Sequence, residues 1–137
     1  MINGVQHYLV VDDDSTSNLL CKLIIQKFDA KAIVASYLRP EEALEYIIEK
    51  YSKTNKSIPT ILFLDVNMPT MTGFEFLDRF LKFNTEIQQQ FTVYILSSSM
   101  EDFSSERKKY PSIADFLSKP LMVSHLKEIH HQKINVF

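Results

Sequence analysis

The chain has 137 residues, with 15 lysines and arginines against 17 aspartates and glutamates and a formal net charge of −2. Its length fits one domain, and 45% hydrophobic with 23% charged residues is the composition of a globular protein rather than a disordered one. The nearly balanced charge excludes a basic footprint for nucleic acid or anionic lipid, and the single cysteine, Cys21, excludes an internal disulfide and a multi-cysteine zinc site.

Short apolar runs alternate along the chain with longer segments of helical period. In chain order the predicted elements are a strand at 8–11, a helix at about 19–28, a strand at 32–35, a helix at about 40–51, a strand at 61–64, a helix at about 73–89, a strand at 93–96, a helix at 101–109, a strand at 114–118 and a helix at about 123–131. Strands that are apolar on both faces indicate a parallel sheet covered by helices on both sides. We therefore predict an α/β fold in one domain, residues 1–137, with a core of about 6–133 and no effector domain.

The predicted helix at 73–89 is unusually rich in apolar residues: Phe74, Phe76, Leu77, Phe80, Leu81 and Phe83. They cover about half of the helix circumference, whereas a surface helix needs a stripe little over 100° wide. Two interpretations stay open. Either a large core absorbs these side chains, or Phe76 and Phe83 form a patch that faces a partner.

The sequence contains no segment typical of a signal peptide or a membrane span. The first six residues lack a basic region followed by a long apolar run. The longest apolar runs have four or five residues, far below the length that crosses a bilayer. We expect a cytoplasmic protein with neither a membrane nor nucleic acid among its partners.

Polar side chains stand at the carboxyl ends of the predicted strands. Asp12 and Asp13 follow the first strand, Asp65 follows the third, Ser97 follows the fourth, and Lys119 ends the fifth. In an open parallel sheet these ends lie along one edge, where ligands bind. The sequence therefore predicts that the five residues form one site.

Three carboxylates in one site repel each other by about 4 kcal/mol per pair, and a divalent cation removes that cost. An all-oxygen ligand set selects a hard ion such as Mg²⁺. Lys119 and Ser97 suit the oxygens of a phosphoryl group, and an aspartate beside Mg²⁺ and lysine suits nucleophilic attack on phosphorus. The two glycines, Gly4 and Gly73, are too few for a phosphate-binding loop, so side chains would hold the phosphate. Gly73 would let the chain turn into the third helix.

Four motifs occur in order along the chain: Val10-Val11-Asp12-Asp13, the run from Leu64 to Gly73, Ile95-Leu96-Ser97-Ser98, and Lys119-Pro120. With these motifs the chain resembles the receiver domain of two-component response regulators over nearly its whole length. The resemblance implies a flavodoxin-like fold, a five-stranded parallel sheet of order 2-1-3-4-5 between two helical layers.

The resemblance also implies roles for individual residues. Asp65 would be the phosphoacceptor, and Mg²⁺ would be held by Asp12, Asp13, Asp65 and the main-chain carbonyl of Asn67. The phosphoryl group would be bound by Ser97 and Lys119.

Two further features are implied by the same resemblance. Ser97 and Phe116 would form the switch pair, in which the aromatic ring moves inward as the hydroxyl turns toward the phosphate. The bond between Lys119 and Pro120 would be cis.

In this interpretation the chain is a signalling domain rather than an enzyme, and it catalyses only its own phosphorylation and dephosphorylation. The phosphoryl donor would be a sensor histidine kinase or a histidine phosphotransfer protein, docked on the first helix beside the acids. The phosphorylated form would change its affinity for a downstream protein. The sequence identifies neither the kinase, nor the target, nor the oligomeric state.

Three other interpretations are weaker. Residues of the first acidic motif can form a solvated turn in which Asp14 or Ser15 caps the first helix. The spacing of Asp12 and Asp14 also fits a haloacid-dehalogenase-like phosphohydrolase with Asp12 as nucleophile, but that family needs acids on a strand after the lysine, and only Glu128 follows Lys119. A receiver-like scaffold that is never phosphorylated leaves the complete acceptor site unexplained.

Overall fold

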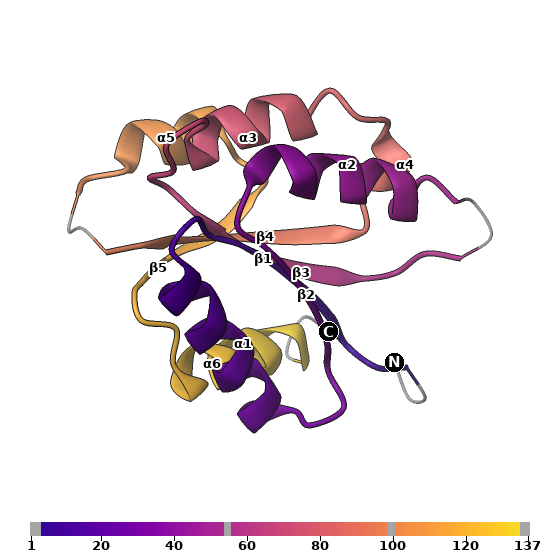
Figure 1. Cartoon of the computed structure of the whole chain (residues 1–137), viewed down its shortest axis with the longest axis vertical. Coiled ribbons are helices and arrows are strands. Elements are labelled where there is room, and N and C mark those ends of the chain that lie inside the picture. The colour runs from indigo at the N-terminus through magenta and orange to yellow at the C-terminus, as the bar shows by residue number, and fades with distance from the viewer. Residues whose placement is uncertain (1–3, 54–55, 99–100, 135–137) are drawn as a thin grey trace.

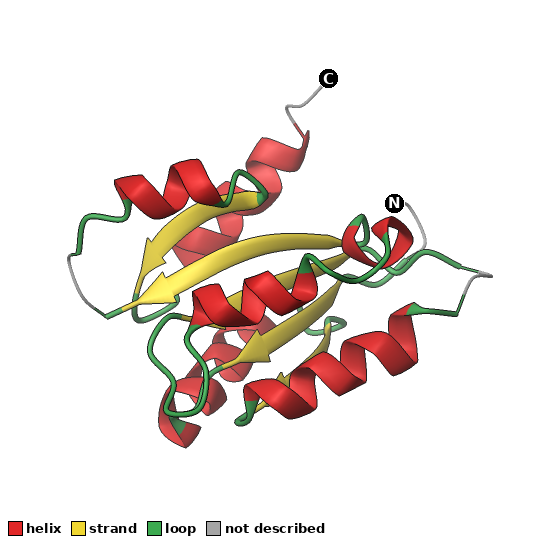
Figure 2. Cartoon of the chain, turned by 90° about the horizontal axis from the view of Figure 1, so that it is seen from above, coloured by secondary structure: helices red, strands yellow, loops and turns green. Residues whose placement is uncertain are grey.

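The computed structural model describes residues 4–53, 56–98 and 101–134. Its sheet consists of β1 (His7–Val11), β2 (Ile33–Tyr37), β3 (Thr60–Asp65), β4 (Phe91–Ser97) and β5 (Ile113–Ser118). All neighbouring strands pair in parallel, in the order β2-β1-β3-β4-β5. Figure 1 shows the sheet nearly edge-on, and the arrows in Figure 2 point in the same general direction. The predicted flavodoxin-like α/β fold is therefore confirmed.

Helices cover both faces of this sheet. They are α1 (Ser15–Phe28), α2 (Pro40–Tyr51), α3 (Gly73–Phe80), α4 (Thr85–Gln88), α5 (Ser104–Lys109) and α6 (Val123–Ile134). Figure 1 shows α1 and α6 on one face and the other four helices on the opposite face. Among the described residues, no helix is both long enough and apolar enough to cross a membrane.

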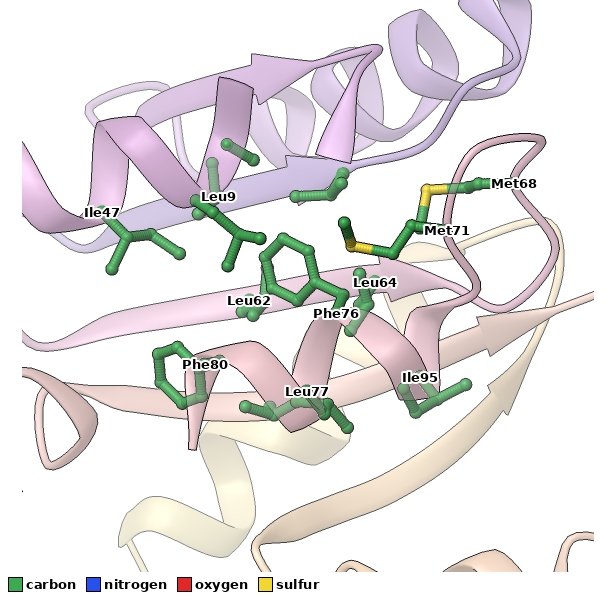
Figure 3. Close-up of a cluster of buried hydrophobic side chains, with 14 of the residues drawn as sticks. Leu9, Ile47, Leu62, Leu64, Met68, Met71, Phe76, Leu77, Phe80 and Ile95 are labelled. Carbon is green, nitrogen blue, oxygen red and sulfur yellow. The ribbon is translucent and has the colours of Figure 1, made fainter. Parts of the chain in front are cut away.

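The core consists of two layers because successive strand residues point to opposite faces. On the α1 and α6 side, Tyr8 and Phe63 stack with ring centroids 6.2 Å apart. On the other side, Leu9 and Leu62 lie next to Phe76 in one cluster, as Figure 3 shows. All six residues of β3 are buried, which agrees with its central place in the sheet and with the apolar run at residues 61–64.

The first helix begins at Ser15, ahead of the apolar residues from Leu19 onward that indicate it in the sequence. The side chain of Asp14, one of the two caps that the sequence offers, accepts hydrogen bonds from the main-chain N–H groups of Thr16 (2.9 Å) and Ser17 (3.3 Å). Asp14 is thus the N-cap of α1, and the apolar period starts only in its second turn. The start of α1 directly after the acids brings its first turn against the end of β1.

The prediction of one continuous helix over 73–89 is wrong. The segment divides into α3, which ends at Phe80, and the short helix α4. Asn84 caps α4 by accepting a hydrogen bond from the N–H of Ile87 at 2.9 Å, and asparagine favours such a cap over a helix interior. The side-chain amide of Gln88 then bonds the carbonyl oxygen of Phe83 at 2.7 Å, which supports the chain between the helices.

The proposed aromatic patch of Phe76 and Phe83 is wrong as well. Phe76 is 0% exposed and lies in the middle of the core layer of Figure 3. Phe83 is half-buried and meets Phe80 edge to face at 5.9 Å. The core therefore absorbs both rings, because the break after α3 turns Phe83 back toward Phe80.

Candidate functional site

The strand ends bring the predicted site residues together. Asp65 ends β3, Ser97 ends β4, and Asp12 and Asp13 follow β1 directly. Lys119 follows β5, where its N–H donates to the carbonyl oxygen of Ser97 at 2.9 Å. Because the strands are parallel, all five residues lie at one edge of the sheet, as the sequence predicts.

Three carboxylates form a compact cluster at this edge. Asp12, Asp13 and Asp65 each offer an oxygen within 4.8 Å of the others. Asp12 and Asp65 are buried at 1% and 7% exposure, while Asp13 is more exposed. All three side chains offer oxygen atoms, so the donor set fits a hard ion such as Mg²⁺ that keeps several waters. It does not fit zinc, which favours nitrogen and sulfur ligands in structural sites.

One lysine bridges two of these carboxylates. The Nζ atom of Lys119 lies 2.8 Å from Oδ2 of Asp12 and 3.0 Å from Oδ1 of Asp65. The Lys119 side chain is 18% exposed, so the triad is largely shielded from water. The peptide bond between Lys119 and Pro120 is cis, as the resemblance implies.

The loop after β3 approaches the acceptor strand closely at one glycine. The N–H of Gly73 donates to the carbonyl oxygen of Val66 at 2.8 Å, and an added Cβ at Gly73 would lie 2.5 Å from the carbonyl oxygen of Asp65. Gly73 does not adopt a positive φ. Glycine is therefore needed for close approach rather than for the turn that the sequence suggested. Asn67 is exposed in this loop, two residues after Asp65.

A cavity of about 320 Å³ joins the two residues of the predicted switch pair. Ser97 and Phe116 both line it. The ring of Phe116 stacks on Phe103 at 5.1 Å, and the guanidinium group of Arg107 lies 4.5 Å from the ring centroid. Arg107 also pairs with Asp115 at 3.4 Å. The aromatic ring thus contacts both a neighbouring ring and a cation, and it lines the same cavity as Ser97.

The protein-family model of the response regulator receiver domain matches residues 8–131 of this chain. The chain belongs to this family. A curated relative, protein-glutamate methylesterase/protein-glutamine glutaminase 3 of Burkholderia thailandensis, is 30% identical over 115 residues, which are 82% of this chain and 28% of that protein. The chain thus spans less than a third of the relative's length.

Solved receiver structures share the fold. A two-component response regulator from Cytophaga hutchinsonii is 24% identical with a TM-score of 0.83, covering 97% of this chain and 99% of the other. A response regulator receiver protein from Dyadobacter fermentans is 20% identical with a TM-score of 0.81, covering 95% and 98%. Chemotaxis protein CheY4 of Vibrio cholerae is 23% identical with a TM-score of 0.69, covering 94% and 98%.

The electrostatics of the receiver site set the protonation of its central groups. Burial raises the pKa of Asp65 from 3.8 to about 6; the hydrogen bond from Lys119 lowers it, and the charges of Asp12 and Asp13 raise it. Burial lowers the pKa of Lys119, but its bonds to Asp12 and Asp65 outweigh burial and raise it. Burial also raises the pKa of the nearby Cys21 thiol to about 11, so this thiol is not a nucleophile at neutral pH.

Replacing Asp65 with asparagine should stabilise the receiver domain above pH 7 when divalent cations are absent. The pKa of Asp65 is about 6 in the folded chain and 3.8 without the fold, so folding favours the protonated form. The protonated form of Asp65 contributes its full stability below pH 3.8, the pKa without the fold. This contribution is lost as the pH rises through about 6, the pKa in the folded chain, and the free energy of unfolding falls by about 3 kcal/mol. Urea unfolding in EDTA between about pH 4 and about pH 8 measures it.

The control is Asp29→Asn, at the far end of α1, which keeps a side-chain oxygen to accept the N–H of Lys31. We expect the stability difference between Asp65→Asn and the wild type to be small at low pH and to grow with pH, while the control follows the wild type. A difference that does not change with pH would contradict the raised pKa of Asp65.

Sequence reasoning missed two residues that contact the site. Ser17 and Asn18, in the first turn of α1, hydrogen-bond the side chain and the main chain of Asp12. The one signal for them in the sequence is weak: short polar side chains just after an N-cap favour partners outside the helix. Their partner is fixed by the packing of α1 against the sheet.

Proposed function

We propose that this receiver domain accepts a phosphoryl group on Asp65 from a phosphohistidine, in a reaction that depends on Mg²⁺. The observation that carries the proposal is the cluster of Asp12, Asp13 and Asp65 within 4.8 Å, with the Lys119 ammonium group 3.0 Å from Asp65. Mg²⁺ would be held by Asp12, Asp13, Asp65 and the main-chain carbonyl of Asn67. When bound, it would neutralise negative charge on the carboxylates and on the transferred phosphoryl group.

The residues of the chain perform the rest of this chemistry. The ionised Asp65 carboxylate attacks phosphorus: the new bond joins its oxygen to phosphorus, and the bond from phosphorus to the histidine nitrogen breaks. That nitrogen leaves with the electron pair. Lys119 and Ser97 bind the phosphoryl oxygens, so catalysis consists of positioning and of charge neutralisation.

The donor in this proposal is a sensor histidine kinase or a histidine phosphotransfer protein, and α1 is its docking face. Three leucines on α1, Leu19, Leu20 and Leu23, are 55%, 49% and 51% exposed. Their helix begins beside the acids, and a groove between α1 and Lys119 is lined by Leu20, Pro120 and Leu121. Apolar side chains grouped beside a charged site favour a protein donor over a free small molecule.

The output in this proposal is a change in affinity for a downstream protein. Ser97 and Phe116 line one cavity, so movement of the Ser97 hydroxyl toward a phosphoryl group changes the space available to the ring. Because Phe116 also contacts Phe103 and Arg107, its movement would alter the surface around α5. The proposed unit is a single receiver domain with a core of about 6–133, and it catalyses only its own phosphorylation and dephosphorylation.

The test is incubation of the purified chain with acetyl phosphate and Mg²⁺, followed by intact-mass measurement and mapping of the hydroxylamine-labile adduct. We expect one phosphoryl group, on Asp65, that is absent in EDTA and in Asp65→Asn. The control Asp29→Asn replaces an aspartate far from the site and should be labelled like the wild type.

Two outcomes would overturn the proposal. A label on Asp12, or a label that survives Asp65→Asn, would favour the haloacid-dehalogenase-like phosphohydrolase. A folded wild-type chain that takes no label would favour the scaffold that is never phosphorylated.

A further inference from the structure

Two consecutive residues in the first turn of α1 hold Asp12 from two directions. The hydroxyl group of Ser17 donates to Oδ2 of Asp12 at 2.7 Å. The buried amide of Asn18 donates to the main-chain carbonyl oxygens of Asp12 at 3.2 Å and of Tyr37 at 3.0 Å. Asn18 therefore fixes where the backbone of β1 ends, and Ser17 fixes the carboxylate that follows it.

The hydrogen-bond donors on the Asp12 carboxylate differ in whether they also bind a second carboxylate. Oδ1 of Asp12 accepts the N–H of Asp14 at 3.0 Å, and Oδ2 accepts both Ser17 and Lys119. Lys119 is shared with Asp65, because its Nζ atom also lies 3.0 Å from Oδ1 of that residue. The hydroxyl group of Ser17 is not shared in this way, because within the described part of the chain it donates to Asp12 alone. Of the two donors on Oδ2, Ser17 is therefore the one that serves Asp12 alone.

A hydrogen bond at Oδ2 helps to fix the orientation of the Asp12 carboxylate. Two donors on different oxygens, the N–H of Asp14 and the hydroxyl of Ser17, prevent rotation of the carboxylate plane. Without Ser17, the donor left on Oδ2 among the described residues is the Lys119 ammonium group, which is shared with Asp65 and stands at the end of a flexible side chain. A metal ligand that rotates freely loses more entropy when it binds, and partners behind a ligand typically change metal affinity by about 10- to 100-fold.

We propose that Ser17 is a positioning residue that orients the Asp12 carboxylate for Mg²⁺. The inference rests on the proposed function, in which Asp12 is a ligand of that ion. Ser17 does not touch the phosphoryl group, so its effect lies in Mg²⁺ affinity and not in the transfer step. The hydroxyl group is what matters, and the size of the side chain is secondary.

The experiment is a calorimetric Mg²⁺ titration of the wild type and of four variants. Ser17→Ala and Ser17→Val remove the hydroxyl, whereas Ser17→Thr keeps it on a side chain of the same shape as valine. Ser15→Ala changes an exposed residue in the same turn. We expect the Kd to rise about tenfold in Ser17→Ala and Ser17→Val. We expect Ser17→Thr and Ser15→Ala to stay near the wild-type value.

The rate of phosphorylation by acetyl phosphate separates positioning from a merely structural role. At saturating Mg²⁺, Ser17→Val should return to nearly the rate of Ser17→Thr, because the defect is one of affinity. Equal Kd values for valine and threonine, or a Ser17→Val rate that stays low at saturation, would overturn the inference about Ser17. A wild type that neither binds Mg²⁺ nor takes a phosphoryl group would instead overturn the proposed function, and the role of Ser17 with it.

Discussion

Replacing Lys119 with methionine should lower the free energy of unfolding by about 3–5 kcal/mol at about pH 8 without divalent cations. The Lys119 ammonium group lies 2.8 Å from Asp12 and 3.0 Å from Asp65, whose side chains are 2% and 9% exposed. Methionine keeps the length of the side chain but leaves two buried carboxylates facing each other without a cation. The loss therefore comes from uncompensated charge and not from lost volume. Urea unfolding followed by circular dichroism measures it.

Two conditions should restore the stability of the Lys119→Met variant. Lowering the pH protonates Asp65, whose pKa is already raised to about 6 and should rise further without the lysine. Mg²⁺ should replace the missing positive charge. Lys127→Met, on the exposed side of α6, is the matched control and should change stability little at any pH. The interpretation fails if Lys119→Met loses no more stability than this control at high pH.

The arrangement of the site could be predicted because it follows from strand topology. Asp12, Asp65 and Lys119 each stand where an apolar run ends, and a parallel sheet aligns such ends whatever the loops between them do. Apolar runs are read reliably from sequence when strands are buried on both faces, as all of β3 is. The placement of the site at the carboxyl ends of the strands can therefore be predicted without any knowledge of side-chain contacts.

The break between α3 and α4 could not be predicted from periodicity. Phe76, Phe80 and Phe83 continue the apolar spacing of a helix across the break, and the capping side chain of Asn84 interrupts it. An asparagine within an apolar period is compatible with either a continuous helix or a new N-cap. The packing of Phe83 against Phe80 favours a new N-cap at Asn84, and this contact forms only in the folded core.

The support for Asp12 was hidden for a related reason. Ser17 and Asn18 are near Asp12 in sequence, yet their direction depends on where α1 begins. Helix boundaries are uncertain by a few residues from sequence alone, and a shift by one residue rotates a side chain by about 100°. The cap at Asp14 fixes this rotation and aims Ser17 at the carboxylate.

Replacing Gly73 with alanine should damage the site more than its single methyl group suggests. On helix propensity alone, alanine at the start of α3 would be favourable by up to about 1 kcal/mol. The structure predicts the opposite sign, because the new Cβ would lie 2.5 Å from the carbonyl oxygen of Asp65 and 3.3 Å from the Cα of Val66. Both contacts are with backbone, so the strand end must move. We expect a loss of about 1–3 kcal/mol in the free energy of unfolding.

The same displacement should slow phosphorylation of Gly73→Ala by about 100-fold, because a shift of the order of 1 Å at a reacting group has that effect. Acetyl phosphate labelling at low temperature, where both proteins are folded, separates this rate effect from instability. Gly4→Ala, in the exposed segment before β1, is the matched control and should be labelled at the wild-type rate. If Gly73→Ala is phosphorylated as fast as that control, the end of β3 has room to adapt. The requirement for glycine would then lie in stability rather than in the placement of Asp65.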